Sequence, residues 1–411
     1  MSTIRTKMIK EFSELQGGLF TKVKKADVGT SLLDLMKNGV DMLCWADPFF
    51  PDKVLPEHIL QAVSDSLTNG SASHYTMPIG NPELKEKIAL KLKRCNNLIV
   101  EPQRNILITP GSDSGLLFAM MPFIEQGDEV LIHSPSYPSN FLNVELLGGT
   151  PVSVELKAEN NFQIDIEDFE KALTDKTKMV ILTNPNNPSG TVLRRESLQA
   201  LADFIIRHDL VLVVDQAFED AIYDDIEFVS IASLPGMWER TVNVFSFSKG
   251  MGLSGFRVGY LVADAQIIDV LFGCTVNVLG ATNTSSQAGM MAALDDSDFM
   301  EGYTQIFENR RKIVYDMMSA IPGVHMLMPE SGFLSWINIS ALGTSAFVCD
   351  YLIEHAQVVV NSGVPYGKGG EGYIRLVQGC YKDDKKLIAI LTRIQKALTQ
   401  LAKEKGICHE Q

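Results

Sequence analysis

The sequence predicts an α/β fold in which a mainly parallel seven-stranded sheet lies between layers of helices, with a smaller α+β domain beside it. Seven short apolar runs lack a clean alternation of polar and apolar residues, which is typical of strands buried on both faces. Longer helical patterns lie between several of these runs, and alternating strands and helices indicate βαβ units with a parallel sheet.

The predicted strands are rich in Val, Ile and Leu. They are Asn105–Thr109, Glu129–His133, Pro151–Leu156, Met179–Thr183, Leu210–Val214, Thr241–Phe245 and Val258–Val262. Helical patterns occupy Asp113–Glu125, Asp165–Thr174 and Arg195–His208. Ligands of such sheets bind at the carboxyl ends of the strands, so the residues that follow each strand are the first candidates for a site.

The last quarter of the chain has a different pattern. A basic helix around Asn309–Lys312 precedes short strands at Phe333–Ile339 and Tyr373–Val377, which indicates a second unit. We therefore expect a large domain over residues 55–304 and a small domain formed by residues 1–54 and 305–411.

Composition excludes several classes of partner. The net charge of −14 opposes binding to nucleic acid or to an anionic membrane, and no apolar run is long enough to span a bilayer. The N-terminal segment has no apolar signal region, and no metal-ligand spacing is visible. The cysteines are scattered without a C-x-x-C pair, so we expect reduced thiols and a cytoplasmic protein. They are Cys44, Cys95, Cys274, Cys349, Cys380 and Cys408.

Polar residues follow several of the predicted strands. Pro110-Gly111-Ser112-Asp113 leads into an apolar helix, and such a turn either presents amides to an anion or is a plain helix cap. For a phosphate, the Asp113 carboxylate must turn away. Tyr137 follows the next strand and either stacks on a flat ring or packs. Asp215 is either a cap or a buried anion that needs a cationic partner.

Phe245–Gly259 is the densest candidate segment. Lys249 follows a strand, glycines surround it, and Arg257 follows with serines nearby. A lysine removed from water becomes a nucleophile that forms imines, whereas a lysine in a flexible surface loop has no such role. Serine hydroxyls and an arginine are natural phosphate ligands.

The pattern S-x-S-K-x-x-G-x-x-G-x-R-x-G over Ser246–Gly259 resembles the lysine signature of class I/II aminotransferases, which are fold-type-I pyridoxal 5′-phosphate (PLP) enzymes. Further segments that resemble the family occur in the family's order along the chain, from about Tyr75 to Arg375. They are Tyr75–Leu84, Pro110–Asp113, Asn184–Gly190, Asp215–Phe218 and Gly370–Leu376.

The resemblance implies roles around the cofactor ring. Lys249 forms a Schiff base with the cofactor aldehyde, and Asp215 pairs with the pyridine nitrogen. Asn187 hydrogen-bonds the ring hydroxyl, and its bond to the next proline is often cis in the family. Tyr137 stacks on the ring.

The resemblance also implies the two ends of the site. The phosphate is held by the turn and the lysine segment, through Gly111, Ser112, Asp113, Ser246, Ser248 and Arg257. Tyr75 reaches the phosphate of a neighbouring subunit, which implies a homodimer. Arg375 clamps the substrate α-carboxylate, and Trp45, Ala46 and Asn187 line the same end.

The sequence departs from the family pattern at two places. Phe218 stands where the family usually has a tyrosine near the ring hydroxyl, so we expect a raised pKa for the Schiff base. The segment Val360–Gly367 also differs, and it borders the substrate in the family.

The implied reaction moves an amino group from an α-amino acid to a 2-oxo acid. A PLP-dependent carbon–sulfur β-lyase is the first alternative, and a non-catalytic PLP sensor is the second. The side chains near the expected site favour aromatic or aliphatic donors, since they would form an apolar pocket; they are Trp45, Phe49, Phe50 and Tyr366. No second arginine for a dicarboxylate is evident, because we interpret Arg104, Arg310 and Arg311 as surface residues.

Overall fold

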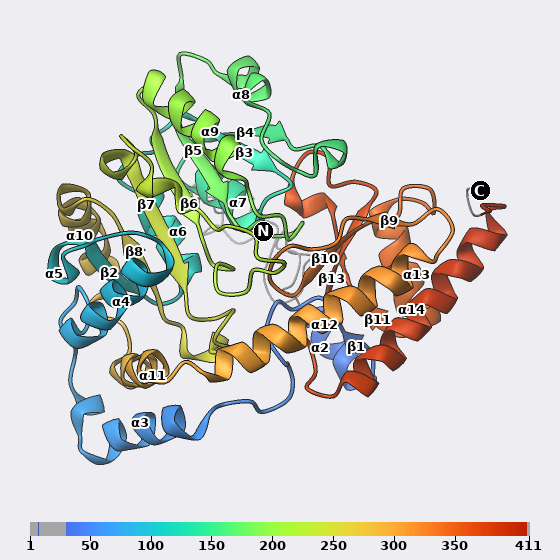
Figure 1. Ribbon diagram of the computed structural model, residues 1–411, viewed down its shortest axis with the longest axis horizontal. Helices are drawn as coiled ribbons and strands as arrows, with labels where there is room; N and C mark the ends of the chain where they lie inside the picture. The colour runs from blue at the N-terminus through green and yellow to red at the C-terminus, as the bar shows by residue number, and fades with distance from the viewer. Residues whose placement is uncertain (1–6, 8–29, 409–411) are drawn as a thin grey trace.

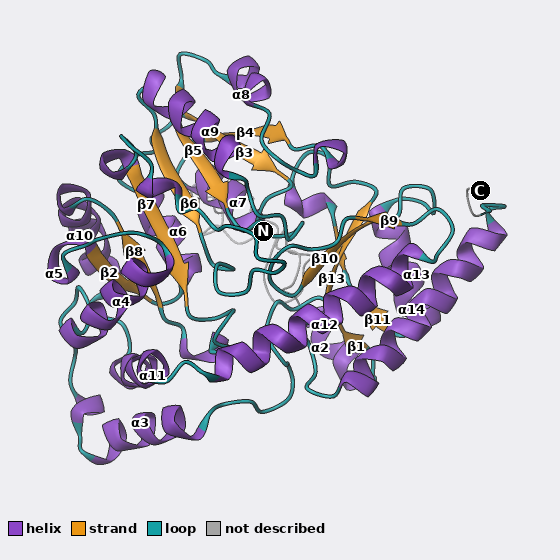
Figure 2. Ribbon diagram, in the orientation of Figure 1, coloured by secondary structure: helices purple, strands orange, loops and turns teal. Residues whose placement is uncertain are grey.

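The computed structural model describes Lys7 and residues 30–408, and its largest element is a seven-stranded sheet flanked by helices (Figures 1 and 2). The strand order is β2-β8-β7-β6-β5-β3-β4. The bounds are β2 Ile106–Thr109, β3 Glu129–Ser134, β4 Thr150–Glu155, β5 Thr177–Thr183, β6 Val211–Asp215, β7 Thr241–Ser246 and β8 Gly259–Val262. β8 runs antiparallel to β7 and β2, and the other pairs are parallel. The predicted fold class and all seven strands are confirmed, with ends within two residues.

Helices cover both faces of this sheet because alternate residues of each strand point to opposite sides. Leu131 belongs to a core with α8 (Ile166–Ala172) and α9 (Arg195–Arg207). Ile132 belongs to the core on the other face. That face is covered by α6 Ser112–Met120, α7 Pro138–Leu146 and α10 Ala265–Leu279. Near β2 and β8 a further core contains residues of α3 Glu57–Thr68, α4 Pro82–Cys95 and α11 Thr284–Asp295.

A smaller antiparallel sheet has the strand order β12-β13-β10-β9, and a short parallel pair joins β1 to β11. These strands are β1 Asp41–Met42, β9 His325–Met326, β10 Leu334–Asn338, β11 Val358–Val359, β12 Asn361–Ser362 and β13 Tyr373–Val377. The remaining helices are α2 Thr30–Lys37, α5 Pro102–Asn105, α12 Phe299–Ser319, α13 Ser345–Ala356 and α14 Asp384–Glu404. The pairing of β1 with β11 joins Asp41–Met42 to Val358–Val359.

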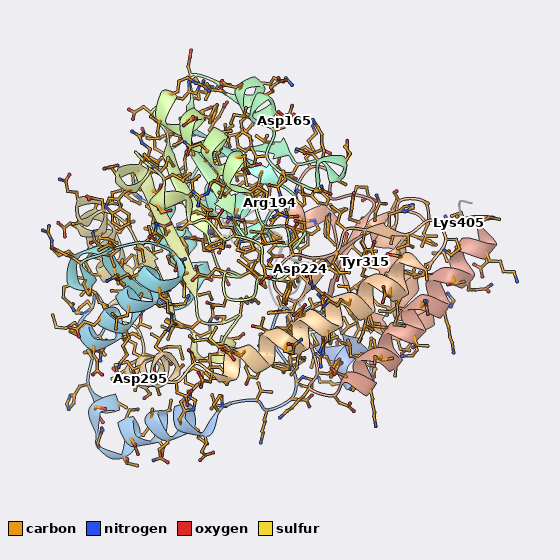
Figure 3. The ribbon with its side chains drawn as sticks, viewed as in Figure 1. Asp165, Arg194, Asp224, Asp295, Tyr315 and Lys405 are labelled. Carbon is orange, nitrogen blue, oxygen red and sulfur yellow. The ribbon has the colours of Figure 1, made fainter. Side chains whose placement is uncertain are left out.

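Arg310 and Arg311 of α12 are not surface residues, so the interpretation from sequence was wrong. Their side chains are 1% exposed. Arg310 donates to the carbonyl oxygens of Gln378, Cys380 and Lys382. Arg311 donates to the Pro329 carbonyl at 2.7 Å and to Asp224, which is labelled in Figure 3, at 2.6 Å. Buried backbone carbonyls need donors, and these two arginines supply them.

The N-terminal segment, the domain boundaries, the helices and the cysteines complete the comparison with the sequence. The N-terminal segment in which we saw no apolar signal region lies outside the described residues. The division into domains at residues 54 and 304 stays a prediction. Within residues 30–408, no helix is long and apolar enough to cross a bilayer, and the cysteines of this range are free thiols.

Candidate active site

A cavity of about 260 Å³ lies where the strands of the large sheet end. Ser112 follows β2, Tyr137 follows β3, Asn187 follows β5, Asp215 ends β6 and Lys249 follows β7. The predicted residues that line the cavity are Trp45, Ala46, Ser112, Asp113, Tyr137, Asn187, Asp215, Phe218, Ser248, Lys249, Arg257 and Arg375. Gly111, Ser246 and Tyr75 do not line it.

The amine of Lys249 is directed into this cavity. Its Nζ donates a hydrogen bond to the carbonyl oxygen of Ala46 at 2.6 Å and lies 5.9 Å from the ring centre of Phe218. The turn that carries it requires glycine at 250, because a Cβ there would lie 2.3 Å from Cβ of Asp220. The close packing of this turn therefore holds the amine between the segment around Ala46 and the end of β6.

The Asp215 carboxyl group is buried, with 5% of the residue exposed. Burial raises its pKa to about 7, and the nearby Asp113 adds to the rise. The backbone amide of Ala217, which donates at 3.1 Å, and the charge of Lys249 both act to lower the pKa. A carboxylate in such surroundings is stabilised by a cationic partner.

Gly111 and Arg257 form a cradle at one end of the cavity. Gly111 has a φ of +86°, and a Cβ there would lie 2.4 Å from Nη2 of Arg257. Nη1 of Arg257 donates to the Ser254 carbonyl oxygen at 3.0 Å and lies 3.5 Å from Oγ of Ser248. Since Ser112 begins α6, the guanidinium, the hydroxyls and the first amides of the helix converge on a place suited to an anion.

Tyr137 and Asp113 are joined by a hydrogen bond of 2.8 Å from the phenol to Oδ1 of the carboxylate. The bond ties the aromatic ring to the first turn of α6 and satisfies part of the Asp113 charge. Asp113 therefore orients Tyr137, and its carboxylate is directed towards the phenol, as an anion in the cradle requires.

Arg375 lies at the opposite end of the cavity on β13 and is 2% exposed. Its Nη1 donates to Oδ1 of Asn187 at 3.1 Å, and its Nη2 donates to the Cys44 carbonyl oxygen at 2.8 Å. Asn361 accepts from Nε at 3.1 Å and from Nη2 at 2.7 Å. The guanidinium, which lines the cavity, is thus held in one orientation.

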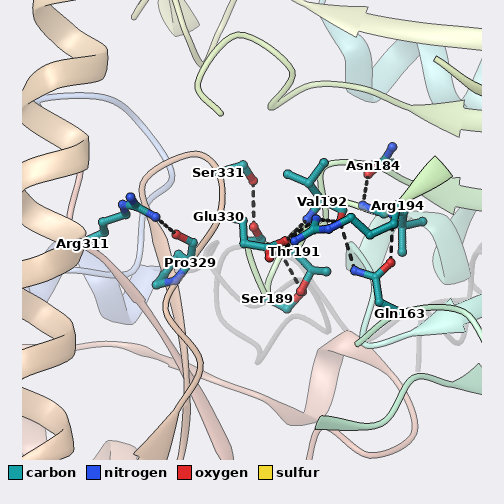
Figure 4. Close-up of polar contacts among 12 residues, drawn as sticks. Gln163, Asn184, Ser189, Thr191, Val192, Arg194, Arg311, Pro329, Glu330 and Ser331 are labelled. Carbon is teal, nitrogen blue, oxygen red and sulfur yellow. Dashed lines mark hydrogen bonds and ion pairs between the residues drawn. The ribbon is translucent and has the colours of Figure 1, made fainter. Parts of the chain in front are cut away.

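The loop after β5, residues 184–194, is anchored to the segment before β10 (Figure 4). Glu330 accepts from the Val192 amide at 2.9 Å and from Nη1 of Arg194 at 3.0 Å. Ser331 donates to the Gly190 carbonyl oxygen at 3.0 Å. These bonds hold the loop that carries Asn187, and the Asn187–Pro188 bond is cis, as the resemblance implied.

The expected apolar pocket is only partly formed. Trp45 lines the cavity, but Phe49 packs against Phe307 with ring centres 5.1 Å apart. Phe50 packs edge-on against Trp45 and lines a neighbouring hollow. Tyr366 lies beneath Arg375, with the guanidinium carbon 5.2 Å from its ring centre. The prediction was wrong for these three because it rested on proximity in sequence.

Sequence reasoning missed three residues that line the cavity, which are Asp47, Ala217 and Ser254. Each lies within three residues of a predicted one or inside the lysine segment, so adjacency was the available signal. It also missed Asn361 as the partner of Arg375. That contact depends on the pairing of β12 with β13, which places Asn361 opposite Arg375.

The residues of the cavity fit pyridoxal phosphate. The cradle at Gly111 has space only while the residue lacks a Cβ, and its donors suit a phosphate dianion. The buried Asp215 suits a protonated ring nitrogen, and the Lys249 amine suits an aldehyde. Among residues 7 and 30–408, no group of three His, Cys, Asp or Glu side chains is arranged to hold a metal ion.

Residues 43–394 match the family "Aminotransferase class I and II". An aspartate aminotransferase of Pyrococcus abyssi is 33% identical over 92% of this chain and 95% of its own length. Aromatic-amino-acid aminotransferase 2 of Thermococcus litoralis is 33% identical over 85% of this chain and 90% of its own. The crystal structure of an aromatic aminotransferase from Pyrococcus horikoshii OT3 superposes with a TM-score of 0.84 at 32% identity, covering 92% of this chain and all of that one. Together with the geometry of the cavity, these matches show that the chain belongs to the class I and II aminotransferases and is a PLP-dependent enzyme of fold type I.

Proposed function

We propose that this aminotransferase exchanges the amino group between an α-amino acid and a 2-oxo acid with Lys249 as its catalytic amine. The observation that carries the proposal is the placement of the Lys249 amine and the buried Asp215 carboxyl on one cavity. An anion cradle lies at one end of that cavity and Arg375 at the other. The two ends match a substrate with a carboxylate and a cofactor with a phosphate.

When bound, pyridoxal phosphate supplies an aldehyde that condenses with amines and a ring that accepts electrons from the substrate Cα. Gly111, Ser112, Ser248 and Arg257 hold the phosphate in this proposal. Asp215 keeps the ring nitrogen protonated. Tyr137 stacks on the ring, Asn187 hydrogen-bonds the ring hydroxyl, and Phe218 borders the ring.

Lys249 has two roles in the proposed reaction. Its Nζ would hold the aldehyde carbon of bound PLP, and as a free amine it would act as the base that takes the proton from the substrate Cα onto Nζ. The Ala46 carbonyl oxygen accepts a hydrogen bond from Nζ at 2.6 Å and so orients the amine. The charge of Arg375 and the remaining N–H of its Nη1 would hold the α-carboxylate and so direct the Cα proton towards Lys249.

The nature of the amino donor is a finer proposal. Trp45 and Phe218 place aromatic surface on the cavity, which supports donors with apolar or aromatic side chains. The curated relatives bear the names of aspartate and of aromatic amino acids, so these are the first donors to test.

We also propose a homodimer in the cytoplasm. Tyr75 is 94% exposed in the single chain, which suits a side chain that reaches a neighbouring subunit. Exposed apolar residues on α3 and α10, among them Leu67 and Val278, support a covered surface nearby. Free thiols support a reducing compartment.

Borohydride reduction of the PLP-loaded enzyme tests the catalytic amine. In the wild-type enzyme we expect peptide mapping to find one reduced cofactor adduct, on Lys249. The Lys249→Arg variant should have no adduct. Lys368 is an exposed lysine in the loop before β13, and the Lys368→Arg variant should keep the adduct on Lys249. An adduct on another lysine overturns the proposal.

Donor screening tests the reaction. Each amino acid is added to the loaded enzyme with 2-oxoglutarate or pyruvate, and loss of the visible band is followed. We expect the 2-oxo acid of the donor to form as the visible band is lost. Release of pyruvate and a thiol from cystathionine without transfer of the amino group would instead identify a β-lyase.

A further inference from the structure

His133 is fully buried on β3 and uses both ring nitrogens. Its Nε2 lies 2.8 Å from the backbone amide nitrogen of Thr183, and its Nδ1 lies 3.0 Å from the carbonyl oxygen of Pro135. An amide N–H can only donate, so Nε2 accepts and Nδ1 must carry the proton. Burial also lowers the pKa of His133 to about 4, which keeps the ring neutral.

The imidazole replaces a bond of the regular sheet. The pairing of β3 with β5 is regular from Val130 opposite Met179 to Ile132 opposite Ile181. Two residues further along β5, the backbone amide of Thr183 donates to the imidazole of His133 instead of to a backbone carbonyl of β3. A side chain therefore closes the pair of strands at the carboxyl end, beside the cavity.

The carbonyl oxygen of Pro135 accepts bonds from the end of β3 and from the loop after β5. Its carbonyl oxygen accepts from Nδ1 of His133 and from Nδ2 of Asn186 at 3.2 Å. Pro135 lies two residues before Tyr137, and Asn186 directly precedes Asn187. One carbonyl oxygen thus links the loop that carries the aromatic ring to the loop that carries the amide.

A second set of bonds joins the loop after β3 to the end of β5 through α7. Nδ2 of Asn140 donates to Oγ1 of Thr183 at 3.0 Å and to Oγ of Ser136 at 3.1 Å. All of these groups are buried, and a buried network that loses one member leaves other members without partners. His133 is the member that bonds the backbone both of the loop after β3 and of the end of β5.

We propose that His133 is a positioning residue that sets the separation of Tyr137 and Asn187, and hence the slot for the cofactor ring. The inference rests on the proposed roles of those two residues. His133 does not line the cavity and so acts only through the Pro135 carbonyl and the Thr183 amide. A displacement of one loop relative to the other would tilt the bound ring.

The test compares three variants with the wild-type enzyme. His133→Phe keeps a ring but removes both bonds. His133→Asn keeps a donor near the position of Nδ1 and so retains the Pro135 bond. Asn105→Leu is the matched control, because buried Asn105 also joins two backbone segments, bonding Glu101 and Ala263, but at the amino end of β2.

Binding of PLP to the cofactor-free proteins and the visible circular dichroism of the loaded enzymes are measured. In His133→Phe we expect the Kd for PLP to rise roughly tenfold, because buried hydrogen-bonding groups are left unpaired. We also expect the dichroic band to weaken. His133→Asn is expected to keep most of the band. Asn105→Leu is expected to lose stability with an unchanged band and Kd.

The outcomes separate this inference from the assignment of the site. If Asn187→Ala weakens PLP binding while His133→Phe behaves like Asn105→Leu at matched stability, the positioning role is wrong. If neither Asn187→Ala nor Tyr137→Ala changes PLP binding or the dichroic band, the proposed site residues are wrong. Where His133→Phe fails to fold, His133→Asn carries the test: because it lacks the bond from the Thr183 amide, a Kd for PLP and a dichroic band identical to those of the wild type also overturn the proposal.

Discussion

The Lys249 amine lies 2.6 Å from the carbonyl oxygen of Ala46, two residues beyond the Cys44 carbonyl that accepts from Arg375. One short segment therefore orients both the amine that we propose for the cofactor and the guanidinium that we propose for the substrate carboxylate. Because this segment follows β1, which pairs with β11, the relative position of the two groups depends on the C-terminal unit as well as on the large sheet.

The cofactor-free enzyme should become less stable as pH rises from about 4 to about 7, through Asp215. Burial raises the pKa of this carboxyl to about 7 from an ordinary 3.8, so the folded state keeps the proton over this range while the unfolded chain loses it. The slope is at most about 1.4 kcal/mol per pH unit. Urea unfolding of wild type and Asp215→Asn at several pH values measures the difference.

The stability advantage of Asp215→Asn should therefore grow with pH in the absence of PLP. Asp209→Asn is the control, since the Asp209 side chain is 94% exposed and should give a curve parallel to wild type. Parallel curves for Asp215→Asn as well would contradict the raised pKa.

Phe218→Tyr should lower the pKa of the Schiff base between Lys249 and PLP. Phe218 borders the cavity with its ring centre 5.9 Å from the lysine amine, and a hydroxyl there adds a donor for the ring oxygen. A spectrophotometric pH titration reads the change. Phe333→Tyr, one ring further from the cavity, is the control. An unchanged or raised pKa in Phe218→Tyr would refute the expectation.

Gly111→Ala should weaken PLP binding, because its Cβ meets Nη2 of Arg257 at 2.4 Å. Gly127→Ala is matched to it, since Gly127 also has a positive φ, of +99°, but no atom lies within 4 Å of the place that its methyl group would take. Both variants should lose about 1 kcal/mol or more of folding free energy from backbone strain. Only Gly111→Ala should show a raised Kd for PLP, and an equal Kd in both would argue against the cradle.

Lys91→Met should destabilise the fold by about 3–5 kcal/mol, because it leaves two buried carboxylates without their cation. Lys91 contacts Glu219 and lies 2.9 Å from Asp220, and all three side chains are at most 9% exposed. Lys171→Met breaks an ion pair whose lysine is 69% exposed and should cost under about 1 kcal/mol. Similar losses of unfolding free energy in the two variants would disprove this view of the buried cluster.

Much of the fold could be predicted because its signals are local. The strands are apolar runs without alternation, and the residues after them are the ones that meet at the cavity. Asp215 and Lys249 could be found in this way, since each directly follows or ends a buried strand.

The remaining contacts depend on segments distant in sequence. Arg310 is buried because the chain around Cys380 presents carbonyl oxygens to it, and nothing near position 310 indicates this. Asn361 meets Arg375 only through strand register. His133 looked like an ordinary polar residue within a strand, because the loss of a regular bond at Thr183 is visible only in three dimensions.

The antiparallel course of β8 limits how the lysine segment can vary in length. Ser246 pairs with Gly259, so the chain between them begins and ends on neighbouring strands. Removing one residue there would slide β8 and exchange the faces of Tyr260 and Leu261, which belong to different cores. Substitutions can retune this segment, but an insertion or deletion would have to be absorbed by the sheet itself.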